Sequence, residues 1–188
     1  MRKLIVKTIA ITLGILIALT SAFYLLLSCC FPKVLSNVYF QIQSEELCLK
    51  YSEKAYENSN DIGDLATLVE RSIVFKKSDK VLTYGVTLIN DQDYQSYLLT
   101  KGDGYHYYLV GNICQVQYNN GDRQTALETA FSNTGEYLAY NPIHKLILLS
   151  AQNGDDESLV KIKSHLLEKE NKNQLINEHL SLIEQLII

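Results

Sequence analysis

The longest apolar run in the chain lies close to its N-terminus. Residues Thr8–Leu27 (TIAITLGILIALTSAFYLLL) are 20 residues without a charged side chain. At about 1.5 Å per residue, a helix of this length spans roughly 30 Å, the thickness of the hydrocarbon core of a bilayer. Lys7 lies at one edge, where its side chain reaches the headgroups, and Tyr24 lies near the other, where interfacial tyrosines are common. The pattern predicts a transmembrane helix.

The rest of the chain shows apolar residues at helical spacing. Three stripes follow the i, i+3, i+4 pattern of helices that bury one face: Ile62, Leu65, Leu68, Val69, Ile73; Leu159, Ile162, Leu166, Leu167; and Leu175, Ile176, Leu180, Ile183, Ile187. Only 2 prolines, both strong helix breakers, occur in 188 residues. We therefore expect an all-α fold, with a membrane anchor and its flanks over 1–32 and a helical domain over 33–188.

Short polar turns separate the predicted helices, and two of them are nearly the same. Gly121-Asp122 and Gly154-Asp155 lie 33 residues apart. In each, glycine ends one helix at positive φ and aspartate caps the next. Weaker echoes occur at Gln43-Ser44 and at Ser78-Asp79, and the longest step between turns predicts an insertion around Asp91–Lys101.

A helix–turn–helix unit that repeats about every 34 residues is typical of the tetratricopeptide repeat. Residues from about Lys33 to Ile188 resemble a divergent array of this family. With Gly121 at the turn glycine, Ile113 falls on the family's usual Leu and Ala126 on its small residue, whereas Cys114 replaces a Gly and Gln117 a Tyr. The resemblance implies an α-solenoid of four helical hairpins, closed by a C-terminal capping helix over Asn173–Ile188.

One segment also fits a different structure. Residues 81–109 are rich in β-formers, and Lys101-Gly102-Asp103-Gly104 has the composition of a hairpin turn. A small β insertion there is the alternative. The helical prediction rests on Tyr105, Tyr108 and Leu109, which keep helical spacing, and on the repeat period.

The same resemblance implies where a partner binds. In tetratricopeptide repeats the first helix of each hairpin lines a concave groove that receives a peptide. Carried over position by position, the predicted groove residues are Tyr108, Asn112, Gln115, Tyr118 and Asn119 from one hairpin, and His144, Lys145 and Gln152 from the next. Tyrosines supply large contact area with a polar tip, although packing between helices explains any one of them equally well.

The distribution of charged residues limits the kinds of partner that we expect and predicts the cellular compartment. The net charge is −4, and three of the basic residues, Arg2, Lys3 and Lys7, precede the apolar run. The remaining acidic surface excludes nucleic-acid binding, which needs a basic face. Because only Lys33 closely follows the run, the positive-inside rule predicts a single-pass plasma-membrane protein with a cytoplasmic N-terminus and an extracytoplasmic C-terminal domain.

The cysteines leave the kind of anchor open. Leu26-Leu27-Ser28-Cys29 resembles a bacterial lipobox, so lipidation of Cys29 competes with a spanning helix and with a cleaved signal peptide. Cys48 and Cys114 fall on the apolar faces of predicted helices, so we expect each to be a small buried apolar side chain. A disulfide between them is the alternative.

We find no pattern that supports catalysis. The sequence has no nucleotide-binding, nucleophile-elbow or zinc motif, so we expect no enzyme, no cofactor and no metal site. His165 and Glu168 share a helix face, which we interpret as a solvated surface. The predicted function is a membrane-anchored adaptor or chaperone-like scaffold that binds a protein or peptide, with a structural accessory subunit or lipoprotein of a bacterial envelope assembly as the alternative.

Overall fold

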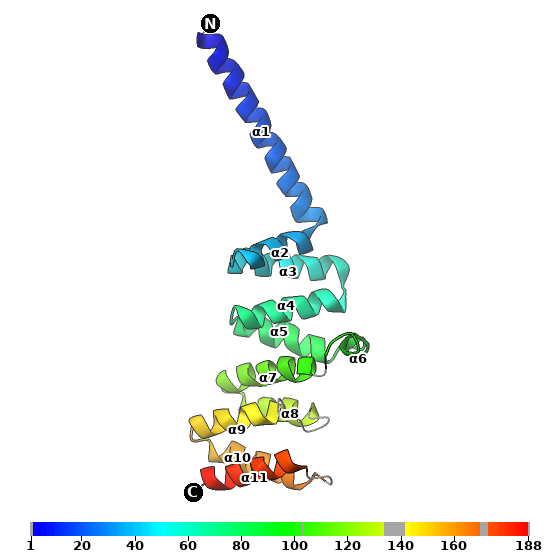
Figure 1. Cartoon of the computed structure of the whole chain (residues 1–188), viewed down its shortest axis with the longest axis vertical. Coiled ribbons are helices and arrows are strands. Elements are labelled where there is room, and N and C mark those ends of the chain that lie inside the picture. The colour runs from blue at the N-terminus through cyan, green and yellow to red at the C-terminus, as the bar shows by residue number, and fades with distance from the viewer. Residues whose placement is uncertain (1, 103, 134–141, 170–172, 188) are drawn as a thin grey trace. The chain divides into compact units, whose positions relative to one another are not determined.

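The computed structural model describes residues 2–102, 104–133, 142–169 and 173–187, and the side chains of all of these except 2–6. Its helices, labelled in Figure 1, are α1 (Arg2–Cys30), α2 (Pro32–Gln41), α3 (Glu45–Ser59), α4 (Ile62–Val74), α5 (Ser78–Ile89), α6 (Tyr94–Leu98), α7 (Gly104–Asn119), α8 (Arg123–Ser132), α9 (Pro142–Gln152), α10 (Asp156–Leu167) and α11 (Gln174–Leu186). No strand occurs among the described residues, which confirms the all-α prediction.

The alternative of a β insertion over 81–109 is wrong. Helices α5, α6 and α7 occupy this segment. The β-formers of α5 fall at helical spacing, so that Val81, Gly85 and Leu88 share one buried face. Burial of that face outweighs a strand propensity that spans only about 1 kcal/mol.

Helix α1 is long and apolar enough to cross a membrane. The qualifying stretch, Lys7–Cys30, has 24 residues, and none of its most apolar window is buried by the other residues that the structure describes. Large side chains such as Ile9, Leu19 and Phe23 are each more than half exposed. An isolated helix covered by aliphatic side chains is suited to lipid rather than to water.

The chain forms two compact units, Met1–Arg71 and Ser72–Ile188. This boundary after Arg71 differs from the one expected from the sequence, which places an anchor over 1–32 and a helical domain over 33–188. The contacts place α1 with the first helical hairpin, because α2 packs on both α1 and α3. A buried polar cluster holds this first unit together: Arg71 donates to Ser36, Ser52 and Asn37 and lies over the ring of Phe40.

Four corners of the chain have the same geometry. Gln43 (φ 55°), Lys76 (φ 55°), Gly121 (φ 88°) and Gly154 (φ 59°) are left-handed, and the next residue's N–H bonds the carbonyl five residues earlier in every case. This is the Schellman helix ending, which satisfies carbonyls at a helix C-terminus. At two of these corners the aspartate cap is confirmed: Asp122 accepts from the Thr125 N–H and Asp155 from the Ser158 N–H.

The corners follow one another after 33, 45 and 33 residues. They separate α2 from α3, α4 from α5, α7 from α8 and α9 from α10. The long step contains the short helix α6 (Tyr94–Leu98), inside the segment 91–101 where the spacing predicts an insertion.

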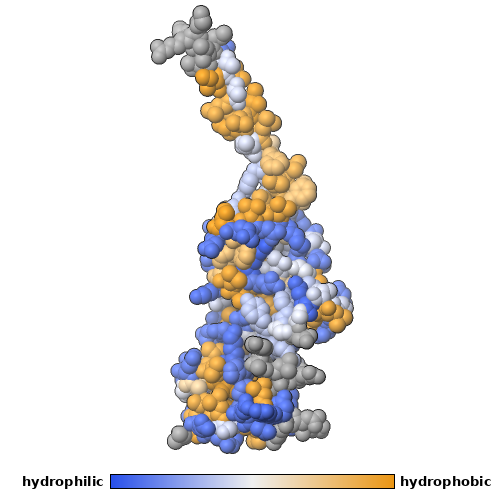
Figure 2. Space-filling view, in the orientation of Figure 1, coloured by the Kyte–Doolittle hydropathy of each residue, from blue (hydrophilic) through white to orange (hydrophobic). Residues whose placement is uncertain are grey.

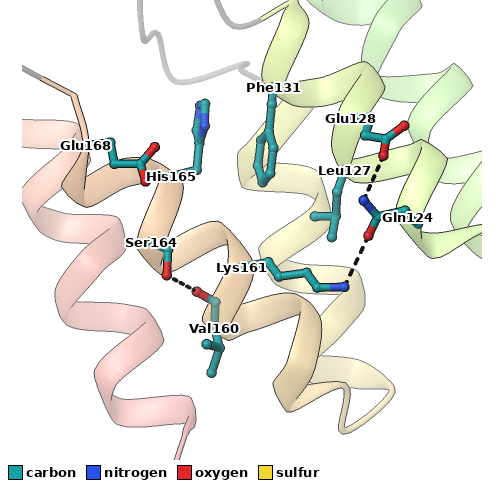
Figure 3. A pocket seen from close by; sticks show the side chains of 9 residues that line it. All are labelled: Gln124, Leu127, Glu128, Phe131, Val160, Lys161, Ser164, His165 and Glu168. Carbon is teal, nitrogen blue, oxygen red and sulfur yellow. Dashed lines mark hydrogen bonds between the residues drawn. The ribbon is translucent and has the colours of Figure 1, made fainter.

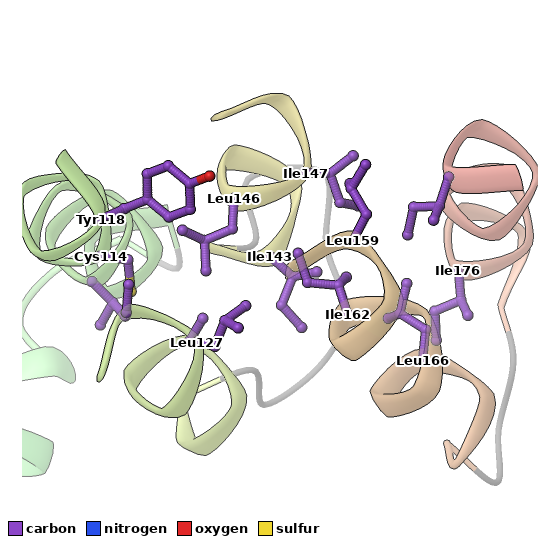
Figure 4. Close-up of a cluster of buried hydrophobic side chains, with 14 residues drawn as sticks. Cys114, Tyr118, Leu127, Ile143, Leu146, Ile147, Leu159, Ile162, Leu166 and Ile176 are labelled. Atoms are coloured by element: carbon purple, nitrogen blue, oxygen red, sulfur yellow. The ribbon is translucent and has the colours of Figure 1, made fainter. Parts of the chain in front are cut away.

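The second unit is a layered stack of helices. Helix α7 packs on α5, α8 and α9; α8 packs on α9 and α10; and α9 packs on α10 and α11. From α7 to α9, each helix thus contacts the next and the next but one, as in stacked hairpins. Figure 4 shows the shared core, whose fully or almost fully buried side chains include Cys114, Leu127, Ile143, Leu146, Ile162 and Ile176. Each buried Leu or Ile stabilises such a core by about 1.5–3 kcal/mol.

Candidate functional site

The predicted groove residues divide into an exposed group and a packed group. On α7, Tyr108 is 46% exposed, Asn112 and Gln115 are partly exposed, and Asn119 is exposed at the end of the helix. Their spacing puts them on one helix face. On α9, Lys145 is half-buried and Gln152 is exposed.

A hydrogen-bonded chain joins three of these residues across α7 and α9. The Lys145 Nζ donates to Asn112 Oδ1 at 3.0 Å, and the Asn112 Nδ2 donates to the Tyr108 carbonyl at 2.7 Å. Burial lowers the pKa of Lys145. The structure therefore joins the side chains of Lys145 and Asn112 to the Tyr108 backbone. We call this surface, together with the exposed Tyr108 ring on the same face of α7, the α7–α9 face.

Tyr118 does not belong to an open groove. Its side chain is only 3% exposed, and its hydroxyl donates to Asp155 Oδ2 at 2.7 Å. Ser158 Oγ donates to the same oxygen at 2.7 Å, and Arg123 Nη1 lies 3.3 Å away. Tyr118 therefore links α7 to the corner before α10, and the resemblance misplaces it because helix spacing alone does not say which neighbour covers a face.

These contacts shift the pKa values at the corner. Burial raises the pKa of Tyr118, and its hydrogen bond to Asp155 raises it further. Burial of Asp155 favours its neutral form, but the hydrogen bonds from Tyr118 and Ser158 and the charge of Arg123 outweigh it, so the pKa of Asp155 is lowered. Asp155 is a charged structural anchor of the corner.

His144 faces a second histidine. Its Nδ1 lies 2.7 Å from Nε2 of His179 on α11, and the ring centroids are 4.7 Å apart. Burial lowers the pKa of His179, and the neighbouring His144 lowers it further. One ring donates and the other accepts, so His144 takes part in the contact between α9 and α11, unlike the exposed Gln152.

The described residues also form a pocket that the sequence does not predict, between α8 and α10 (Figure 3). It has a volume of about 360 Å³ and apolar side chains from Leu127, Phe131 and Val160. Lys161 donates to Gln124 at 3.1 Å, and Gln124 donates to Glu128 at 2.7 Å, which forms a polar wall. We call this surface the α8–α10 pocket.

His165 completes this pocket, and its interpretation as solvated surface is wrong. Its ring stacks on Phe131 with centroids 4.0 Å apart and planes 7° apart, and its Nε2 is buried without a hydrogen-bond partner among the described residues. Burial lowers its pKa, and the charge of Lys169 lowers it further. Phe131 and His165 come from different hairpins, so their contact has no signature in local sequence.

The cysteines differ sharply in exposure. Cys29 and Cys30 are exposed at the end of α1, whereas Cys48 and Cys114 are buried, and all four are free thiols. Burial raises the pKa of Cys114 to about 12. The reading of Cys48 and Cys114 as small buried hydrophobes is confirmed, and a thiol with so high a pKa is no nucleophile at neutral pH.

Within the described ranges, no three His, Cys, Asp or Glu side chains gather as ligands for a metal ion. No family model, curated protein or solved structure matches the chain. The apolar helix α1, the α7–α9 face and the α8–α10 pocket are therefore the features from which a function is inferred.

Proposed function

We propose that this protein is a membrane-anchored interaction module that binds a segment of a partner protein on the α7–α9 face. The observation that carries the proposal is the chain of hydrogen bonds from Lys145 through Asn112 to the Tyr108 backbone, beside an exposed Tyr108 ring. Helix α1 supplies the anchor.

The chemistry of the α7–α9 face suits recognition of a peptide. A tyrosine ring offers large contact area with little loss of conformational entropy, and the side-chain amide of Asn112 offers both a donor and an acceptor. Because Lys145 and Asn112 already hold each other, binding costs less side-chain ordering. The ammonium group of Lys145 favours a partner segment that carries a carboxylate or backbone carbonyls.

The repeated corners support a tetratricopeptide-like array. Four Schellman endings spaced by 33, 45 and 33 residues agree with a helical hairpin of about 34 residues and one insertion. In such an array the first helix of each hairpin faces the groove, and α7 and α9 are first helices by this count. Helix α11 is then the capping helix.

The flanking charges support a defined orientation. Arg2, Lys3 and Lys7 precede the apolar stretch, and Lys33 follows it. Lys33 is the only basic residue within the first dozen residues after that stretch, so the basic residues are concentrated on the N-terminal side. The N-terminus is then cytoplasmic and the helical hairpins extracytoplasmic. Tethering raises the effective concentration of the binding face for partners in the same membrane.

Photo-crosslinking in cells that naturally make the protein tests this proposal. A photoreactive phenylalanine analogue replaces Tyr108 on the α7–α9 face or, as the control, Val160 in the α8–α10 pocket; the two are similarly exposed, at 46% and 50%. We expect one discrete partner protein, in the membrane fraction, from position 108 and none from position 160. A partner captured only from position 160, or from neither, would overturn the proposed face.

A further inference from the structure

Helix α2 carries an uncovered apolar stripe immediately after α1. Phe31, Val34, Val38 and Ile42 are 50%, 50%, 49% and 64% exposed. Val34 and Val38 lie on one side of α2, and Phe31 and Ile42 continue the spacing of three and four residues at the two ends of the helix. The adjoining side, with Leu35 and Ser36, is buried in the first unit. Exposure of such an apolar stripe to water is unfavourable unless another apolar surface covers it.

Contacts fix α2 and α3 to the last turns of α1. The Tyr24 hydroxyl lies 2.7 Å from that of Tyr51 on α3 and 3.4 Å from that of Tyr39 on α2. The Tyr39 and Tyr51 rings stack with centroids 5.6 Å apart. Asn58 on α3 donates to the Cys29 carbonyl at 3.4 Å. The hairpin is thus joined to α1 at two levels.

The position of Tyr24 sets the depth of this hairpin. Tyr24 lies three residues before Leu27, the last residue of the apolar run Thr8–Leu27, or about 5 Å along a helix. A tyrosine at that depth lies where hydrocarbon gives way to headgroups. Its partners Tyr39 and Tyr51 must then lie at the same level, since hydroxyl contacts of this length allow no gap.

We propose that α2 lies in the membrane–water interface, with Phe31, Val34, Val38 and Ile42 among the upper acyl chains. This inference rests on the anchoring role proposed for α1. Lipid is the occupant because the stripe is uncharged and continuous with the lipid-suited surface of α1; Figure 2 shows hydrophobic surface at the end of α1 extending onto the adjoining part of the first unit. Interfacial helices sink their apolar side about 5–10 Å into this boundary.

The lack of tryptophan in the chain gives a clean probe, because one introduced Trp reports alone. Three full-length variants are reconstituted in phosphatidylcholine vesicles with brominated acyl chains: Val38→Trp on the stripe, Leu16→Trp in the middle of α1, and Val160→Trp on α10. Val38 and Val160 are matched in residue type and in exposure, at 49% and 50%. Bromine quenches only tryptophans that reach the acyl chains.

We expect Leu16→Trp and Val38→Trp to be quenched several-fold more strongly than Val160→Trp, and Val38→Trp to be protected from aqueous acrylamide. If Leu16→Trp is quenched while Val38→Trp behaves as Val160→Trp does, the interfacial position of α2 is wrong and the anchor stands. If Leu16→Trp is not quenched, the anchor itself fails and the inference fails with it.

Discussion

The Tyr118 hydroxyl donates a 2.7 Å hydrogen bond to the Asp155 carboxylate, so the last turn of α7 holds the residue that caps α10. Asp155 is 7% exposed and also accepts from Ser158. One buried carboxylate therefore caps α10, lies in the corner between α9 and α10, and joins this corner to α7.

Tyr118→Phe should destabilise the protein by about 1.5–3 kcal/mol, the usual contribution of a hydrogen bond to a charged group. The ring volume is unchanged, so the loss isolates the hydroxyl. Thermal unfolding of the full chain in detergent measures it, with Tyr108→Phe as the control because that ring is 46% exposed. Equal losses of stability in the two variants would show that the hydrogen bond to Asp155 does not stabilise the protein.

The left-handed corners should respond in opposite directions to glycine and alanine. Gly121→Ala and Gly154→Ala should each cost roughly 1–2 kcal/mol, because a side chain at positive φ is strained. An ideal Cβ at either glycine meets nothing within 4 Å, so strain is the only penalty. Gln43→Gly and Lys76→Gly should be neutral or stabilising by up to about 1 kcal/mol. Destabilisation by both glycine variants would contradict the shared corner geometry.

Arg71 should be essential to the first unit. Arg71→Leu removes charge-assisted hydrogen bonds to Ser36, Ser52 and Asn37, and we expect a loss of about 2–3 kcal/mol. Burial lowers the pKa of Arg71, which reflects how little water reaches it. Thermal unfolding gives the comparison with Lys50→Leu, an exposed basic residue on α3. A melting temperature equal to that of Lys50→Leu would rule out the structural role.

Stability should fall on acidification below pH 6.5. The pKa of His179 is lowered from 6.5 in the folded protein, by burial and then by His144, against the opposing charge of Glu178. The unfolded chain therefore binds the proton first, and folding weakens as pH falls from about 6.5 through the lower folded pKa. Melting curves at about pH 7.5 and about pH 5.5 measure this, and His179→Gln should reduce the difference. An unchanged difference would assign the pH dependence to other groups, with His106 and His165 shifted in the same direction.

Local signals in the sequence predict the elements well. The apolar run marks α1, and the Gly121-Asp122 and Gly154-Asp155 pairs mark two corners, because a glycine at positive φ and an aspartate cap act within a few residues. The corners at Gln43 and Lys76 have no glycine–aspartate pair in the sequence. A side chain at positive φ costs free energy at each, and packing of the flanking helices offsets that cost.

The surfaces are harder to predict because they depend on which helix faces meet. Tyr118 has the spacing of a groove residue but meets Asp155, 37 residues away, in the core. His165 has the spacing of a solvated residue but stacks on Phe131. Asn112 and Lys145 do lie together, because their helices are consecutive first helices of hairpins. Periodicity identifies a face, whereas long-range packing decides what covers it.

Affinity measured for the full chain in nanodiscs decides whether a membrane-associated partner binds the α7–α9 face. The partner captured from position 108 is titrated against the wild type, Asn112→Ala, Lys145→Ala and the pocket variant Lys161→Ala. Loss of either member of the Asn112–Lys145 pair should weaken binding by about tenfold, or about 1.4 kcal/mol, with Lys161→Ala within about twofold of the wild type. Wild-type affinity in both α7–α9 variants, with a loss in Lys161→Ala, would show that the partner binds away from the α7–α9 face.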